Sequence, residues 1–152
     1  AYMGISARSN LELAKIWSKK NNFTLIPFET NSHTGGSIYH SDVMMYIGTE
    51  LAVVCEDSIT NGKNEVIENL ERTHKLMTIS QSQLLDFCGN CIEVRDHQNR
   101  LCLVMSSKAV SGYDESQREI LDQFYDRIIH SDLTTIENYG GGSARCMIME
   151  LY

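Results

Sequence analysis

The sequence has 152 residues, of which 42% are hydrophobic, which is enough for the core of one domain but not of two. Its 20 acidic and 13 basic side chains give a formal net charge of −7, and no basic stripe is present that would neutralise phosphates. No run approaches the roughly 18 consecutive apolar residues of a membrane span. We therefore expect one soluble globular unit over residues 1–152 that binds neither nucleic acid nor membrane.

The five cysteines are an odd number in a chain without a secretory signal, which favours free thiols in the cytoplasm over a disulfide framework. Cys88 and Cys91 have the spacing of a zinc or redox motif, but no second pair completes four ligands, so we expect no metal site. The first residue is Ala1 and not methionine, so we expect that some chain upstream of it is absent.

The first predicted elements are a short strand at 2–6, a helix at 10–20 and a strand at 23–28. Ser9 and Glu12 have the spacing of a capping box at the start of that helix. The helix also carries an apolar stripe, which we expect to bury against a sheet, formed by Leu13, Ile16 and Trp17.

A longer unit follows. Apolar runs at 43–47 and 51–55 flank a turn at Gly48, which predicts a hairpin. An amphipathic helix comes next, with its apolar stripe formed by Val66, Ile67 and Leu70. A short strand at 77–79 ends the unit.

The same order returns in the last third of the chain. Strands at 91–94 and 101–105 flank a polar turn, a helix spans 114–130, and a strand follows at 133–136. The helix begins with a capping box formed by Asp114 and Gln117.

The unit of hairpin, helix and strand therefore occurs twice in full, with Val53 and Leu103 at equivalent positions. A truncated copy opens the chain, and its hairpin lies beyond the N-terminal end. A unit of this size cannot cover both faces of its sheet without neighbours, so the units must stack. Pro27, the only proline, predicts an edge or a chain end in the strand at 23–28.

Three consecutive glycines, 140–142, precede a predicted final strand that contains Cys146. Glycines in series allow a sharp turn or the close approach of a ligand, so this loop is expected to line a cavity. A thiolate at the mouth of such a loop is a candidate nucleophile, although a cysteine on an apolar strand is more often a core residue. Arg145, its neighbour on that strand, would point the other way and be structural.

His40 and Asp42 precede the first complete hairpin at a spacing that, in extended chain, places both side chains on one face. The pair would bring a base and an acid into one space; the alternative is a surface histidine followed by a turn aspartate. Asn90 occupies the equivalent position before the second hairpin and could reach the same cavity.

The segments 39–45, 87–90 and 140–147 resemble the guanidine-modifying superfamily of arginine deiminases and amidinotransferases, and most closely the bacterial citrulline-utilisation hydrolases. The resemblance runs from about Met3 to the end of the chain. A His-x-Asp motif followed by a late Gly-rich cysteine, in this order, is more specific than either motif alone.

The resemblance implies an α/β fold, a pentein-like α/β propeller of ββαβ modules around a pseudo-fivefold axis. This chain would supply about two and a half of its five modules, at roughly 1–35, 36–86 and 87–152, as a C-terminal segment. The expected partner is the missing N-terminal half, on the same chain or another.

The resemblance also implies a cysteine-nucleophile C–N hydrolase that needs no cofactor. It would act on the guanidino or ureido group of arginine or citrulline through a covalent thioether-type intermediate. Cys146 would be the nucleophile and His40 the acid and base. The implied substrate-binding residues are Asp42, Asn90, Gly141 and Gly142. Some close relatives carry Asn at position 42, so the choice between guanidinium and ureido substrates stays open. The alternative function is a non-catalytic binding or assembly module in which the two catalytic residues are relics.

Overall fold

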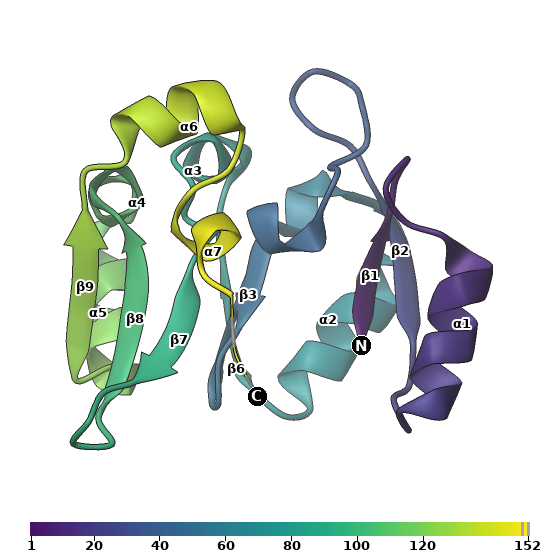
Figure 1. Cartoon of the computed structure of the whole chain (residues 1–152), viewed down its shortest axis with the longest axis horizontal. Coiled ribbons are helices and arrows are strands. Elements are labelled where there is room, and N and C mark those ends of the chain that lie inside the picture. The colour runs from purple at the N-terminus through teal and green to yellow at the C-terminus, as the bar shows by residue number, and fades with distance from the viewer. Residues whose placement is uncertain (150, 152) are drawn as a thin grey trace.

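The computed structural model, which describes residues 1–149 and 151, contains three sheets of three strands each. Figure 1 shows the sheets side by side along the longest axis of the molecule. The mixed α/β architecture and the modular repeat that the sequence predicted are both present. None of the helices in the described part of the chain combines the length and apolarity of a membrane span.

Two sheets have the same construction, in which a middle strand pairs antiparallel with its hairpin partner and parallel with the strand after the helix. The first consists of β3 (Met45–Ile47), β4 (Leu51–Val54) and β6 (Lys75–Thr78), with helix α2 (Lys63–Glu71) before the last strand. The second consists of β7 (Ile92–Arg95), β8 (Leu101–Ser106) and β9 (Arg127–Ser131), with helix α5 (Glu115–Phe124). Val53 and Leu103 each occupy the third position of a middle strand and are fully buried, so the predicted equivalence is confirmed.

The N-terminal sheet is the truncated copy. β1 (Tyr2–Ile5) leads through α1 (Leu11–Lys20) to a parallel partner, β2 (Ile26–Thr30), and β5 (Ile59–Asn61) pairs antiparallel on the far side of β2. Strand β2 is central in its sheet and not an edge strand, but the edge predicted at Pro27 is present locally, since β2 is paired on one side only at this residue. The proline is tolerated because β5 opposite it reaches only Glu29 and Thr30, while Pro27 itself pairs with β1 alone.

Helix α1 differs most from its prediction. Its N-cap is Asn10, whose Oδ1 accepts from the Leu13 N–H at 2.9 Å, and the predicted capping role of Ser9 is wrong. The apolar stripe does not bury against a sheet: Leu13 and Ile16 are each 65% exposed and Trp17 is 50% exposed. By contrast, α2 and α5 bury the stripes that the sequence indicated, through Val66, Leu70 and Leu121, and Asp114 and Gln117 form the expected capping box.

The C-terminal third also departs from the predicted elements. The helix predicted at 114–130 ends at Phe124, because Tyr125 turns to extended backbone and the Asp126 carboxylate accepts the Leu101 N–H at 2.9 Å. β9 then begins three residues later, and the strand predicted at 133–136 is instead part of helix α6 (Thr134–Gly140). Apolar pairs at 120–121, 124–125 and 128–129 satisfy helical spacing throughout, so periodicity alone does not mark this boundary.

The predicted final strand is wrong as well. Residues Ala144–Met147 form α7, a single helical turn, and the end of that predicted strand, Glu150, lies outside the described residues. The sequence also missed several short helices, namely η1 (Ser41–Val43), η2 (Glu56–Ser58), α3 (Gln81–Leu85) and α4 (Ser107–Gly112).

Candidate active site

Cys146 lies on α7, directly after the glycine-rich loop. Gly141 ends α6 in the left-handed conformation, with a φ of 72° that favours glycine. Ser143 is the N-cap of α7, and its carbonyl accepts the Cys146 N–H at 3.1 Å. The turn exposes the thiol, whereas the other four cysteines are fully buried.

Gly142 lets the backbone pass against the sulfur. A Cβ atom at this position would lie 2.6 Å from Cys146 Sγ and 2.9 Å from its Cβ, far inside van der Waals contact. The glycines therefore do what the sequence indicated, allowing a sharp turn and a close approach, but the approach is between two parts of the same loop.

Asn90 joins the cysteine loop to the His40 segment. Its Nδ2 donates to the Asp42 carbonyl at 2.8 Å and to Cys146 Sγ at 3.2 Å, and its Oδ1 accepts the Ser143 N–H at 2.9 Å. The side chain is fully buried. The predicted contact of Asn90 with substrate is therefore not what this structure shows, since every polar atom of the amide is bonded to protein.

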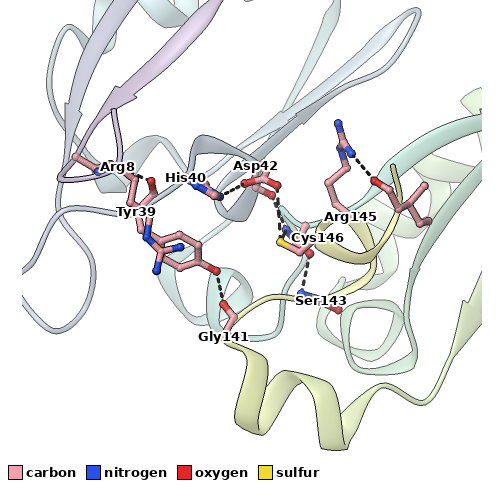
Figure 2. A network of polar contacts seen from close by, with 11 residues as sticks. Arg8, Tyr39, His40, Asp42, Gly141, Ser143, Arg145 and Cys146 are labelled. Atoms are coloured by element: carbon pink, nitrogen blue, oxygen red, sulfur yellow. Dashed lines mark hydrogen bonds and ion pairs between the residues drawn. The ribbon is translucent and has the colours of Figure 1, made fainter. Parts of the chain in front are cut away.

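His40 and Asp42 meet, although not through extended chain as predicted. Asp42 lies on the 3-10 turn η1 and His40 precedes it, with Nδ1 of the imidazole 3.9 Å from Asp42 Oδ1. The other carboxylate oxygen, Oδ2, lies 3.7 Å from Cys146 Sγ (Figure 2). Asp42 Oδ1 is buried and accepts no hydrogen bond from the residues that the structure describes, which leaves one carboxylate oxygen for a further donor.

A cavity of about 380 Å³ brings these groups together. It is lined by His40, Asp42, Gly142 and Cys146 together with Arg8, Tyr39 and Arg145. A neighbouring hollow of about 340 Å³ shares Arg8, Tyr39, His40, Asp42 and Arg145. The candidate nucleophile, base and acid therefore face one space that is large enough for an amino-acid side chain.

Tyr39 is a member of the site that the sequence analysis did not select. Its hydroxyl donates to the carbonyl of Gly141, and the guanidinium carbon of Arg8 lies 4.9 Å from its ring centre. Burial raises the pKa of Tyr39, and the nearby Cys146 and Asp42 raise it further, so the hydroxyl remains a donor near neutral pH. The carbonyl of Gly141 thus accepts a bond that positions the loop, and the contact of Gly141 with substrate stays a prediction. The signals in the sequence were its position directly before His40 and its place in the segment 39–45, which carries the family resemblance.

The prediction that Arg145 points away from the site is wrong, because it assumed that residues 145 and 146 lie on a strand. On a strand it would point away from Cys146, but on the helical turn α7 it also lines the cavity, while its Nη1 donates to the Ile148 carbonyl at 3.2 Å. Figure 2 shows the guanidinium group extending away from the sulfur. The cavity therefore has two arginines, Arg8 and Arg145, at its border.

Within residues 1–149 and 151, no three His, Cys, Asp or Glu side chains lie close enough together to hold a metal ion. Cys88 and Cys91, the pair with metal-like spacing, are fully buried. Burial raises the pKa of Cys88 to about 12, and it also raises the pKa of Cys91, so both are neutral thiols.

Solved structures of two proteins, ArgZ and AgrE, have the same fold as this chain. The N-terminal domain of ArgZ, described as an arginine dihydrolase of cyanobacteria and solved as a mutant bound to substrate, aligns with a TM-score of 0.75 and 17% identity over 97% of this chain. The same domain covalently bound to a reaction intermediate aligns with a TM-score of 0.70 and 16% identity over 96% of this chain. AgrE, in complex with ornithine and NAD+, aligns with a TM-score of 0.74 and 16% identity over 97% of this chain.

The chain spans 50% of the first ArgZ structure, 49% of the second and 20% of AgrE. No curated protein sequence matches it. A family model does match, over residues 1–152, and its description is N,N dimethylarginine dimethylhydrolase, eukaryotic. The chain belongs to this family, and so to the guanidine-modifying superfamily that its motifs predicted.

Proposed function

We propose that this protein is a cysteine hydrolase that cleaves a C–N bond in the guanidino or ureido group of an arginine-related amino acid. One observation carries the proposal: Cys146, His40 and Asp42 line the same cavity, although the first is about a hundred residues from the others. The family to which the chain belongs is described as a dimethylarginine hydrolase, which supports the same substrate class.

For a guanidinium substrate, the Cys146 thiolate attacks the central carbon and forms a C–S bond. The tetrahedral adduct then expels one nitrogen as a neutral amine, which takes its proton from the His40 imidazolium. The product of this half-reaction is an S-linked thiouronium ion. The departing amine is ammonia for arginine and dimethylamine for a substrate dimethylated on one terminal nitrogen.

In the second half-reaction, the neutral imidazole of His40 takes a proton from water as the oxygen attacks the thiouronium carbon. Collapse of this adduct breaks the C–S bond, returns the thiolate and leaves a ureido product. A ureido substrate would follow the same two steps through a thiocarbamate. His40 is half exposed at the cavity, with 51% of its side chain accessible, so water can reach it.

The charges at the cavity fit such a substrate. Among residues 1–149 and 151, nothing donates a hydrogen bond to Asp42 Oδ1, and a carboxylate can accept paired N–H donors from a planar guanidinium. Arg8 and Arg145 provide cations at the same cavity, which suits the carboxylate of an amino acid. The mechanism requires a free thiol, so we place the protein in a reducing compartment such as the cytoplasm.

We further propose that the active enzyme contains a second half of the propeller. In the two complete units, the middle strand pairs with a hairpin partner on one side and with a later strand on the other. Within the described residues, β1 pairs only with β2, and its second edge carries no such partner. The second half would supply that partner, which is the hairpin strand that the truncated unit lacks.

A pair of alkylating probes tests the function. Chloroacetamidine carries an amidinium that mimics a guanidinium, while chloroacetamide has the same reactive carbon and no charge. We expect a single adduct on Cys146 by peptide mass spectrometry, faster with the amidinium probe, slowed by arginine, and absent in Cys146→Ser. Asp42→Asn is expected to remove the preference for the charged probe. Equal rates for both probes in the unsubstituted protein, without protection by arginine, would show that Cys146 is only an exposed thiol.

A further inference from the structure

Asn90 makes more polar contacts at the site than any group placed there by the proposed mechanism, yet it does not touch the cavity. It lies on the loop between α3 and β7, and its backbone carbonyl also accepts the Arg145 N–H at 3.4 Å. One fully buried residue thus bonds positions 143, 145 and 146 on one side and Asp42 on the other.

The hydrogen-bond network fixes which way the amide points. Ser143 presents an N–H to Oδ1, and Asp42 presents a carbonyl to Nδ2. A flipped amide would set N–H against N–H and oxygen against oxygen, leaving buried groups unpaired. Nδ2 has two hydrogens and two acceptors, the Asp42 carbonyl and the Cys146 sulfur, so one N–H necessarily points at the sulfur.

A donor fixed in this way favours the negative form of the sulfur. A hydrogen bond to an ionised acceptor is roughly twice as strong as one to a neutral acceptor. The thiolate also needs this help, because Asp42 Oδ2 lies 3.7 Å from the same sulfur and repels a negative charge. Apart from Asn90, no other side chain donates to Cys146 Sγ among the hydrogen bonds of the described residues.

We propose that Asn90 is the positioning residue of the nucleophile: its Nδ2–H holds the Cys146 sulfur at the cavity and stabilises the thiolate against the Asp42 carboxylate. This proposal rests on the proposed function, in which Cys146 is the nucleophile. Asn90 would then act on the reaction through the Cys146 sulfur and not by contacting substrate.

The test is the pH dependence of Cys146 alkylation by iodoacetamide, which needs no substrate. Because the other four cysteines are fully buried, the native protein reports on Cys146 alone. Asn90→Asp keeps the volume and the acceptor for Ser143 but removes the donor. Asn90→Ala removes the whole amide and leaves a small cavity instead of a new charge.

We expect both variants to move the midpoint of the rate against pH upward by about one unit and to lower the rate at pH 7 about tenfold. Ser143→Ala is the matched control. It breaks the 2.6 Å bond from Ser143 Oγ to Glu137 in the same buried loop without touching the sulfur, so its pH midpoint should stay unchanged. Thermal melts monitored by circular dichroism verify that each variant is folded at the assay temperature.

Unchanged midpoints in Asn90→Asp and Asn90→Ala would overturn the proposal, and so would an equal shift in Ser143→Ala, since the effect would then come from loosening the loop. The outcome is separable from that of the proposed function. A shifted midpoint in a protein that shows no amidinium preference would uphold the role of Asn90 and refute the substrate class.

Discussion

The sulfur of Cys146 lies 3.7 Å from the Oδ2 atom of Asp42, across 104 positions of the chain. The contact joins α7, at the C-terminal end of the last unit, to the turn η1 that precedes the hairpin of another unit. Catalysis in the proposed enzyme would therefore depend on how two modules stack, and not on any single motif.

His40→Ala is expected to lower kcat by two to four orders of magnitude, since general acid–base catalysis typically contributes about that much. The chloroacetamidine adduct on Cys146 should still form, because that alkylation needs no proton for its leaving group. Release of amine from arginine and dimethylarginine measures the first effect. His33→Ala, an exposed histidine earlier in the same loop that does not line the cavity, serves as the control and should retain full activity. Equal turnover in both variants would remove His40 from the mechanism.

Gly142→Ala should inactivate the enzyme, because its Cβ would lie 2.6 Å from Cys146 Sγ and push the nucleophile out of place. Gly140→Ala is the matched control, since a Cβ there meets only Ile136 Cγ2 at 3.6 Å, an ordinary contact. The comparison is made by adduct formation and by turnover. If the two alanine variants behaved alike, the close approach at Gly142 would have no functional consequence.

Alkaline pH should destabilise the protein through Cys88. Burial raises the pKa of this thiol to about 12 from the ordinary value of 9.0, so the folded state favours the protonated form. The contribution of the Cys88 thiol to the free energy of unfolding is therefore fully present below about pH 9, and it is lost as the pH rises from 9 to 12. Urea unfolding measured at several pH values should show this decline, and Cys88→Ala should show a shallower one. If stability fell equally with pH in Cys88→Ala and in the unsubstituted protein, the group responsible would not be Cys88.

The exposed face of α1 should make this 152-residue chain self-associate when it is isolated. Leu13, Ile16 and Trp17 are at least half exposed, and Phe23, which stacks on Trp17 with ring centres 5.3 Å apart, is 53% exposed. Large contiguous apolar patches are uncommon on monomers. Sedimentation velocity should therefore show species larger than a monomer.

Leu13→Lys combined with Ile16→Lys is expected to shift that distribution toward the monomer. Asn64→Lys, at an exposed position on α2, controls for added positive charge and should leave association unchanged. A single monomer boundary for the unsubstituted chain, with cooperative melting, would contradict the prediction.

The sequence could predict the elements whose partners are close along the chain. The hairpins at β3–β4 and β7–β8, the buried stripes of α2 and α5 and the capping box at Asp114 depend on short-range spacing and appear as expected. It could not predict where α5 ends, because apolar pairs continue at helical spacing into β9, and pairing with β8 decides the boundary. The prediction that the apolar stripe of α1 is buried was also wrong. Helical spacing shows that one face is apolar, but that face is buried only if another element packs against it.

By itself, the sequence determined that the chain is an α/β repeat and which residues are chemically able to act, namely a cysteine after a run of glycines and a His-x-Asp motif. The tertiary structure decided which of their atoms meet. It placed Cys146 on a helical turn, brought Arg145 and Tyr39 to the cavity, and buried Asn90 between two loops. The physical reason is that side-chain periodicity encodes only which face of an element is apolar, whereas contacts between distant segments follow from how the modules pack.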